Sequence, residues 1–446
     1  MQEDFSALVM TSANRSDEPI CIRNREAVER LRGIADGFLV HNRDILVRCD
    51  DGITAVYAGE PTLFRRSRGL APRPLLLMES LPEVLALGAE LKGVLCLVRE
   101  NMAFLSPHIG DLETPLARDF FHETMALMER ITECRPEIIA CDLHPDYYAS
   151  RTAARMKDRT VISIQHHHAH IASCLAENRE TGTVLGLAMD GTGLGTDGRI
   201  WGGEFLVVHE TDFIRRGHLK HFLLPTGEGA IRHPWRMAVG LLQMAYGASW
   251  PEWAERLRLL PSDFAPAMME RILDRRINSP ETSSLGRLFD GVAAILGLRR
   301  EKVSFEGQAA MQLEALARQG QGSVLPYNIE KEDGVFILDM FPAIRILTEQ
   351  MLAGKPVTGL AASFHTTLIS AFADLSGQIC VEENLDRAAL SGGCFQNRIL
   401  YEGTVATLEK TGLKVLTHRL VPNNDGCIAL GQAVVAGYRI KKERAL

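Results

Sequence analysis

The amino-acid sequence predicts an α/β protein with two similarly built lobes and a partial domain before them. Short apolar segments with the composition of strands alternate with segments whose apolar residues recur at helical spacing, and this order occurs twice. The copies cover about residues 84–183 and 184–446, and a mostly helical insertion at about 234–319 interrupts the second. The content of 46% hydrophobic and 24% charged residues is that of a globular protein and excludes disordered, collagen-like and coiled-coil classes.

Residues 1–75 form a separate N-terminal segment in this scheme. The apolar stretch Phe5–Met10 is typical of a strand, and it runs directly into the turn-forming cluster Thr11–Asn14. A helix-like segment follows from Arg25 to Gly33, and later prolines place the domain boundary over Ala71–Pro82. Because a domain seldom begins on a strand of central type, this segment is predicted to be part of a domain.

The first copy opens with three strand candidates and continues as strands and helices in alternation. The strand candidates are Val84–Leu87, Gly93–Val98 and Met102–Leu105. Thr114 and Pro115 supply the cap and first turn of the next helix. The remaining elements are a strand at Ile138–Cys141, a helix around Tyr148–Met156, a strand at Val161–Gln165 and a helix after His168.

The second copy also opens with three strand candidates, which we expect to form an antiparallel group. They are Val184–Met189, Trp201–Val208 and Ile214–Phe222. After the insertion come a helix over Ala361–Val381, a strand at Ala388–Ser391, a helix after Gln396, a strand at Lys414–Leu416 and a last helix from Cys427.

Charge, hydropathy and cysteine usage exclude several classes of protein. The net charge of −7 is spread without long blocks of one sign, which argues against a nucleic-acid partner. No run approaches the roughly 20 apolar residues of a membrane span, and the first residues lack a basic region followed by an apolar one. The nine cysteines form no C-x-x-C pair, so we expect reduced, mostly buried thiols in a cytoplasmic protein without a membrane partner.

The run Gln165–His170 places four histidines at a strand-to-helix junction. If the helix begins near His166, then His166 and His170 project from one face and can bind one cation through imidazole nitrogens. The alternative is a polar helix start with solvated histidines. Two histidines leave a divalent ion underligated, so a carboxylate from elsewhere is required.

Three glycine-containing junctions are candidate anion or metal sites. Asp190–Gly195 ends a strand, and its glycines let backbone N–H groups approach phosphate, although a tight hairpin uses glycines equally well. Ser391–Gly393 precedes a helix, where free amides bind anions; a plain loop is the alternative. Asn423–Gly426 precedes the last helix, and Asp425 is either a cap or the third metal ligand, with Asp190 as another acidic neighbour.

Glu306 follows the inserted helices and is able to accept hydrogen bonds from ribose hydroxyls, although a lone glutamate is more often a surface residue. The duplicated β-β-β-α-β-α pattern resembles the ribonuclease-H-like lobes of the actin, Hsp70 and sugar-kinase superfamily. That resemblance implies a nucleotide in the cleft between the lobes.

Eight motifs in a shared order are similar to the HypF family, the carbamoyltransferases of nickel–iron hydrogenase maturation. These motifs are Leu87–Lys92, Ser106–Glu113, Asp142–Tyr147, Gln165–His170, Asp190–Gly195, Glu306–Ala309, Ser391–Asn397 and Asn424–Gly426. Residues 1–75 resemble the carboxy-terminal half of the family's YrdC-like α/β domain, whose Ser-x-Asn motif corresponds to Ser12 and Asn14.

The resemblance implies a reaction and a set of site residues. Carbamoyl phosphate and ATP give carbamoyl adenylate, whose carbamoyl group passes to the C-terminal cysteine thiol of the partner protein HypE. One divalent ion, iron or zinc, on His166, His170 and Asp425 would polarise the carbonyl or orient the phosphate. His166, His170 and Asp190 are the candidate catalytic residues, with Asp190 as a candidate base. The implied nucleotide-binding residues are Ser12, Asn14, Thr192, Gly193, Gly195, Gly227, Glu306, Gly392, Gly393 and Asn397.

Three parts of the full family pattern are absent from this sequence. It has no acylphosphatase domain, no pair of C-x-x-C zinc fingers and no first half of the YrdC-like domain. We therefore expect carbamoyl transfer rather than the complete reaction from carbamoyl phosphate. Two alternatives remain open: a tRNA threonylcarbamoyladenosine transferase, and a non-catalytic remnant that docks HypE or nucleotide.

Overall fold

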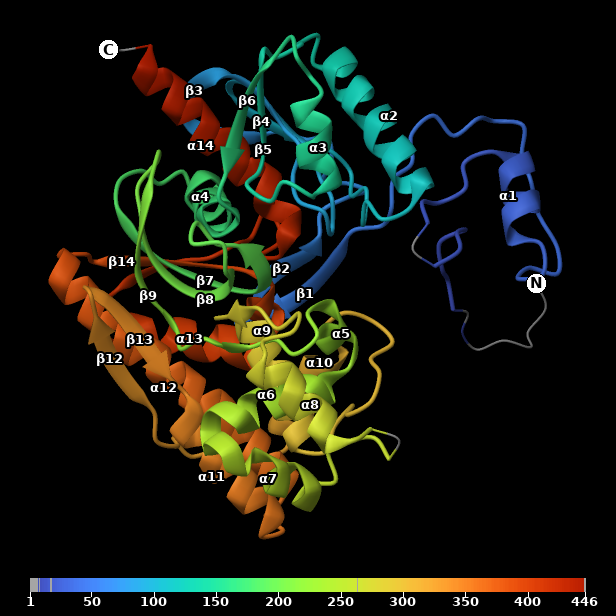
Figure 1. The fold of residues 1–446 in the computed structure, drawn as a ribbon. Helices are drawn as coiled ribbons and strands as arrows, with labels where there is room; N and C mark the ends of the chain where they lie inside the picture. The colour runs from blue at the N-terminus through green and yellow to red at the C-terminus, as the bar shows by residue number, and fades with distance from the viewer. Residues whose placement is uncertain (1–6, 8, 17, 263, 445–446) are drawn as a thin grey trace.

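The computed structural model describes residues 7, 9–16, 18–262 and 264–444, which form two α/β lobes with an N-terminal segment beside them (Figure 1). The first lobe contains a four-stranded sheet in the order β4-β3-β5-β6. Its outer pair is antiparallel, and β5 runs parallel to both β3 and β6. The four strands are β3 (Leu75–Ala86), β4 (Cys96–Leu105), β5 (Ile138–Asp142) and β6 (Thr160–Ile164).

The second lobe contains a larger sheet whose main path is β12-β13-β9-β8-β7-β14-β15. The expected antiparallel group is confirmed, because β8 pairs antiparallel with both β7 and β9. The strands are β7 (Val184–Leu194), β8 (Ile200–Val208), β9 (Phe213–Leu219), β10 (Phe222–Leu223), β11 (Glu281–Thr282), β12 (Asn328–Glu332), β13 (Val335–Asp339), β14 (Arg387–Ser391) and β15 (Lys414–Leu416).

Helices cover the sheets and make up most of the insertion, as predicted. The helices of the first copy are α2 (Pro115–Ile131), α3 (Tyr148–Ala154) and α4 (His166–Asn178). The insertion and the segment before it contain α5 (Glu228–Arg232), α6 (Pro234–Tyr246), η1 (Gly247–Ser249), α7 (Trp250–Arg256), α8 (Pro266–Asp274), α9 (Leu285–Ile295) and α10 (Gln308–Ala317). The chain then continues through α11 (Phe341–Leu352), α12 (Val357–Glu383), η2 (Gly393–Gln396), α13 (Arg398–Lys410), η3 (Asp425–Cys427) and α14 (Ile428–Glu443).

Helices α4 and α14 pack against each other between the two sheets (Figure 1). The last helix returns to the first lobe and packs on β3, β4 and β5, while α4 packs on β7 and β14 of the second. Gly431 makes this close approach possible, because a Cβ atom there would lie 1.8 Å from the carbonyl oxygen of Ala169. The N-terminus of α4 and the segment before α14 therefore meet between the lobes.

The two-lobed α/β class is confirmed, but the first copy opens with two long strands instead of the three short ones predicted. Gly93–Val98 and Met102–Leu105 belong largely to the single strand β4. Glu100, which suggested a turn, has a φ of 56°, and the pairing with β3 shifts register on both sides of it. The strand thus accommodates the irregular residue as a bulge and does not reverse.

The N-terminal segment contains the predicted helix as α1 (Asn24–Leu31), followed by a hairpin of β1 (Ile53–Tyr57) and β2 (Glu60–Arg65). Figure 1 shows α1 to one side of the lobes. The strand predicted over Phe5–Met10 lies partly outside the described residues, and Ala7, Val9 and Met10 are not in a strand. The boundary predicted over Ala71–Pro82 is not a linker throughout, because apolar residues from Leu75 onward already pair in β3.

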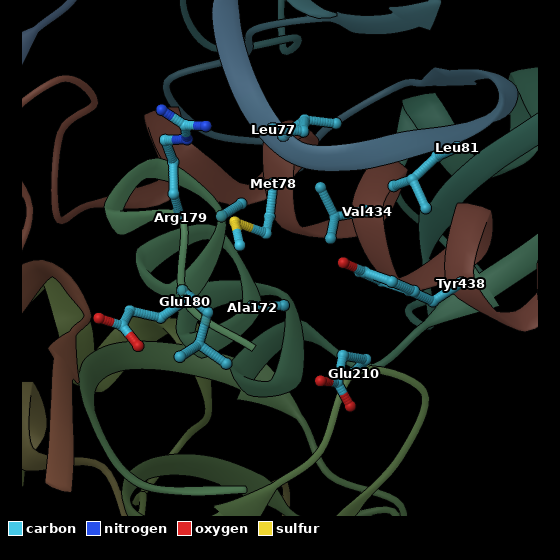
Figure 2. A pocket seen from close by; sticks show the side chains of 11 residues that line it. Leu77, Met78, Leu81, Ala172, Arg179, Glu180, Glu210, Val434 and Tyr438 are labelled. Atoms are coloured by element: carbon cyan, nitrogen blue, oxygen red, sulfur yellow. The ribbon is translucent and has the colours of Figure 1, made fainter. Parts of the chain in front are cut away.

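The irregular middle of β3 closes over α4 and α14. Figure 2 shows Leu77, Met78 and Leu81 facing Ala172 of α4 and Val434 of α14. The space between them is about 20 Å³, room for about one water molecule. This region is packing between the elements that position the site.

Candidate metal centre and adjoining cavity

Two histidines at the start of α4 direct their rings to the same place. The Gln165 side chain accepts a hydrogen bond from the His168 backbone N–H and thereby caps the helix. His166 and His170 are one turn apart, and their ring centroids lie 5.0 Å from each other. Within the described part of the chain, neither Nε2 has a hydrogen-bond partner, although both rings are buried. A buried nitrogen without a partner is costly, and a bound cation would satisfy both.

Two carboxylates complete the cluster from other elements. Asp190 lies in β7, and Asp425 begins the short helix η3 that leads into α14. Asp190 Oδ2 is 3.4 Å from His166 Nε2 and 3.7 Å from His170 Nε2. Asp425 Oδ1 lies 3.8 and 3.7 Å from the same two nitrogens. The structure therefore brings the three predicted ligands together and adds Asp190 to them.

The donor set fits a divalent transition metal. Four ligands placed tetrahedrally about 2.1 Å from one ion lie about 3.4 Å from one another. The four donor atoms here all lie within 4.8 Å of one another. Two imidazole nitrogens with two carboxylate oxygens suit zinc or iron better than calcium or magnesium, which prefer oxygen alone.

Each ligand is also held by a second contact. Asp142, at the end of β5, places Oδ2 2.8 Å from His166 Nδ1, and Ser391, at the end of β14, places Oγ 3.0 Å from His170 Nδ1. The Gly393 backbone N–H donates to Asp190 Oδ1 at 2.9 Å. Burial raises the pKa of Asp190, but His166 and His170 outweigh it and hold that pKa well below its usual value. Asp190 is therefore a carboxylate ready to coordinate a cation.

A cavity of about 430 Å³ adjoins the cluster, and Asp190 and Asp425 line it. Three of the predicted nucleotide-binding residues, Glu306, Gly393 and Asn397, also line it. As far as the described residues go, the lining does not include Ser12, Asn14, Thr192, Gly193, Gly195, Gly227 or Gly392. Their predicted contact with the nucleotide has no support from this cavity.

Packing explains several of these glycines. A Cβ at Gly193 would lie 2.6 Å from His167 Cε1 and 2.9 Å from His166 Cδ2, so this glycine lets β7 approach the histidine run. A Cβ at Gly195 would lie 2.1 Å from Trp201 Nε1. Ser12 and Asn14 form a hydrogen bond of 2.5 Å with each other in the exposed N-terminal segment.

The cavity has walls that the sequence did not predict. Tyr57 and Phe64 come from the β1–β2 hairpin, and Asp290 from α9 pairs there with Arg287 at 2.9 Å. Lys92 of the first lobe reaches Glu306 across the cleft at 2.5 Å. The available signal for Asp290 was its carboxylate within a largely apolar helical segment. No local signal marked the hairpin.

Cys394 also lines the cavity. Burial raises the pKa of its thiol well above the usual value, and the nearby Asp190 carboxylate acts in the same direction. Because the thiolate is the nucleophilic form of cysteine, the structure gives no support to Cys394 as a nucleophile.

Three models of known protein families match this sequence. A family model described as Carbamoyltransferase, Kae1-like Domain, second subdomain matches residues 186–432. The chain belongs to the HypF family of carbamoyltransferases. A model described as HypF Kae1-like domain matches residues 79–177, and one for the Sua5, YciO and YrdC proteins, described as Telomere recombination, matches residues 1–67. The predicted YrdC-like segment is thereby confirmed.

Relatives of known name agree with this placement. The carbamoyltransferase HypF of Rhizobium leguminosarum bv. viciae is 42% identical over 99% of this chain, which covers 56% of that protein. A HypF homolog of Cupriavidus necator is 36% identical over 79% of this chain and 91% of its own length. The chain thus spans little more than half the length of the Rhizobium protein.

A solved structure gives the same result. The crystal structure of full-length HypF in the phosphate- and nucleotide-bound form is 39% identical, with a TM-score of 0.91, and the match covers 97% of this chain and 56% of that one. In the described part of this chain, no helix has the length and apolar character needed to cross a membrane.

Proposed function

We propose that this chain transfers a carbamoyl group from carbamoyl adenylate to the C-terminal cysteine thiol of HypE, a step toward the cyanide ligand of nickel–iron hydrogenases. Membership of the HypF family supports the proposal. We call His166, His170, Asp190 and Asp425 the metal-type cluster. The observation that carries the proposal is that the two carboxylates of this cluster also line the 430 Å³ cavity. An acyl adenylate in that cavity would have its reacting end against the cluster.

The lining matches the parts of an adenylate. Phe289, Ala310 and Met311 offer apolar surface for the base. Asp290 and Glu306 offer carboxylates for ribose hydroxyls. Gly191 and Gly393 lack side chains, so backbone there can approach a phosphate closely. The proposal therefore keeps Glu306 and Gly393 as nucleotide contacts and adds Asp290.

His166, His170, Asp190 and Asp425 would hold the divalent ion, iron or zinc. When bound, such an ion acts as a Lewis acid that stabilises negative charge on a carbonyl or phosphoryl oxygen. The chain's own residues prepare the site: Asp142 orients the His166 ring, and the Gly393 N–H fixes Asp190. Lys92, close to Glu306, adds positive charge at the cavity mouth, where its pKa is raised because Glu306 and Asp425 outweigh burial.

The incoming thiol must lose its proton before attack, and its sulfur then bonds to the carbonyl carbon as the bond from that carbon to the phosphate oxygen breaks and AMP leaves. Asp190 is a poor base for this step, because one oxygen accepts from Gly393 and the other faces both imidazoles. We therefore propose Asp190 as a fourth ligand, and HypE brings its own thiol to the cavity. No disulfide links the cysteines of the described residues, which fits transfer to a free thiol in the cytoplasm.

The proposal concerns the transfer step. Carbamoyl phosphate and ATP are the precursors of the adenylate, and the family resemblance assigns its synthesis to the acylphosphatase and YrdC-like domains, the second of which residues 1–67 match. The transfer site, by contrast, is built from α4, β7 and η3, all within the described residues.

The test is the mass of HypE after incubation with this chain. With preformed carbamoyl adenylate, we expect HypE to gain one carbamoyl group, and HypE without its terminal cysteine to gain none. Asp425→Asn removes a cluster carboxylate and should abolish the gain. Asp374→Asn, which changes an exposed carboxylate on α12 that accepts from the Tyr327 hydroxyl, is the matched control and should retain it.

The possible outcomes distinguish a transferase from a docking protein. An unmodified HypE with the parent protein and preformed adenylate would contradict the transferase proposal and leave a docking protein. A gain with carbamoyl phosphate and ATP alone would show that this segment also makes the adenylate.

A further inference from the structure

A row of buried polar side chains begins at Nδ1 of His170, the ring nitrogen that does not face the metal-type cluster. Ser391 Oγ lies 3.0 Å from this nitrogen, and His418 Nε2 lies 2.8 Å from the same Oγ. Glu177 Oε1 lies 3.0 Å from His418 Nδ1. The side chains of Glu177 and His418 are 2% and 1% exposed, so water does not compete for these contacts.

The carboxylate at the far end of the row is firmly held. The backbone N–H groups of Arg419, Leu420 and Val421 donate to the two oxygens of Glu177 at 2.8 to 2.9 Å. These bonds fix the loop after β15, and with it His418, against the last turn of α4. Glu177 contacts His418 Nδ1 as a close charge and not as an in-line hydrogen bond, and its negative charge favours a proton on that nitrogen.

One polarity of this row suits metal binding at His170. In the neutral His418 ring with its proton on Nδ1, Nε2 is an acceptor, and the Ser391 hydroxyl donates to it. The lone pairs of Ser391 Oγ are then free to accept from the Nδ1–H of His170. A His170 ring with its proton on Nδ1 carries the lone pair on Nε2, which is the form that binds a metal.

We propose that Glu177, His418 and Ser391 are positioning residues that set the tautomer and orientation of His170 and so raise the affinity of the site for its metal. The inference rests on the metal centre of the proposed function. Asp142 supports His166 through one carboxylate, whereas the support of His170 passes through three side chains from α4, β14 and the loop after β15.

Cys427 is the competing partner of His170. Its Sγ lies 3.3 Å from His170 Nδ1 and 3.9 Å from Ser391 Oγ. A thiol sulfur accepts hydrogen bonds weakly, whereas a hydroxyl oxygen accepts them well. The row through Ser391 makes the shorter contact with His170 Nδ1 and is taken as the support, and Cys427→Ala tests the sulfur as the alternative.

The test measures metal affinity on protein stripped of metal and titrated with Co²⁺ or Zn²⁺ against a competing chelator. Ser391→Ala should weaken binding about 10- to 100-fold and change the visible absorption of the Co²⁺ form. His418→Phe keeps a ring but removes the acceptor, and it should also weaken binding. The double variant should bind within about twofold of Ser391→Ala, because both changes break one row.

Two variants control for packing. Ser376→Ala removes a buried hydroxyl for which the described residues offer no hydrogen-bond partner, and Cys427→Ala removes the competing sulfur. Both should bind metal within about twofold of the parent. Melting temperatures of the metal-free proteins confirm folding, and if Ser391→Ala does not fold, His418→Phe decides alone.

The possible results distinguish a failure of the proposed metal centre from a failure of the positioning role. A parent protein that binds neither ion overturns the proposed metal centre itself. Parent-like affinity in both Ser391→Ala and His418→Phe overturns only the positioning role, as do losses that add fully in the double variant. A larger loss in Cys427→Ala than in Ser391→Ala assigns the support to the thiol and also overturns the proposal.

Discussion

The two histidines of the cluster share one helix but have unlike partners. His166 faces the Asp142 carboxylate at 2.8 Å, and His170 faces the neutral Ser391 hydroxyl at 3.0 Å. Burial lowers the pKa of His166, but Asp142, Asp190 and Asp425 together outweigh it and raise that pKa to about 10. The acidic surroundings that favour a proton on this ring also favour a metal ion in its place.

Replacing His170 by Ala should release the metal and strongly reduce carbamoyl transfer while the fold persists. The change removes one of two nitrogen ligands and should weaken metal affinity by at least about 100-fold, since even outer partners contribute 10- to 100-fold. Metal content after purification checks it. His168→Gln is the control, because the His168 ring lies beside Phe213 and the His209 carbonyl. Equal metal content in His170→Ala and the parent would contradict the ligand assignment.

Glu204 in β8 is a buried charge whose loss should be costly. Its carboxylate accepts from Arg215 Nε at 2.7 Å, from Ser283 Oγ at 2.5 Å and from the Gly202 and Gly203 N–H groups. Glu204→Gln leaves Arg215 short of its partner and should lower the free energy of unfolding by about 3–5 kcal/mol at neutral pH. The exposed pair Lys331–Glu382 offers a control, and Glu382→Gln should cost about 0–1 kcal/mol.

The stabilisation that the Glu204 carboxylate provides should increase with pH. Burial raises the pKa of Glu204, but Arg215, His167 and His218 together outweigh it and lower that pKa from 4.5 to about 2. The stabilisation is therefore complete above pH 4.5 and is lost as the pH falls toward 2. Melting temperatures of parent and Glu204→Gln should differ most near neutral pH and converge in acid. A constant difference across this range would contradict the assigned charge.

The sequence predicted His166, His170 and Asp425, because spacing on a helix and a strand-to-helix junction are local features. It did not predict Asp190 as a ligand or Asp142 as a partner. Both carboxylates lie on strands of different sheets, and only the packing of α4 between those sheets brings them to the histidines.

At the scale of elements, the β1–β2 hairpin joins the N-terminal segment to the cavity of the second lobe. The Tyr57 hydroxyl donates to the Gln396 carbonyl at 2.6 Å, and the Tyr57 ring packs on Tyr401 with centroids 5.6 Å apart. The Asn424 side chain, next to Asp425, donates to the Phe64 carbonyl at 3.1 Å. A segment matched to YrdC-like proteins thus forms a wall of the 430 Å³ cavity.

Tyr57→Ala should weaken nucleotide binding about fivefold, because it removes an aromatic side chain from the wall of the cavity, and such a contact contributes roughly 1 kcal/mol. Calorimetric titration with AMP checks it. Tyr57→Phe keeps the ring and loses only the hydrogen bond to Gln396, so its affinity should match the parent while its stability falls by about 1 kcal/mol. Unchanged AMP affinity in Tyr57→Ala would show that the β1–β2 hairpin does not contribute to nucleotide binding.

Elements with strong periodicity were predictable, and those that depend on tertiary pairing were not. Helix α12 carries a long apolar pattern, and its structure extends the predicted range by a few residues at each end. The hairpin β12–β13 escaped prediction, because Asn328–Glu332 is polar and mostly exposed. This edge strand is held by pairing with β13, which in turn runs parallel to β9.

At the scale of the molecule, the cluster joins parts that the sequence treats as separate lobes. His166 and His170 begin the helix between the sheets, Asp190 belongs to the second sheet, and Asp425 precedes the helix that returns to the first. Lys92 and Glu306 add a bridge across the same cleft. The duplication made two lobes predictable, but their junction depends on α14 crossing back, which no local pattern shows.

Because one ion would tie these elements together, metal removal should lower the stability of the whole chain. A ligand present at 100 times its dissociation constant stabilises the native state by about 2.7 kcal/mol. For a protein of this size, the melting temperature should fall by roughly 3 °C after chelation and recover when Zn²⁺ or Fe²⁺ is restored. Asp425→Asn should melt at one temperature with or without chelator, since it lacks a ligand from the returning segment. If the variant shifted as much as the parent, the ion would bind elsewhere, and the lobes would meet without its help.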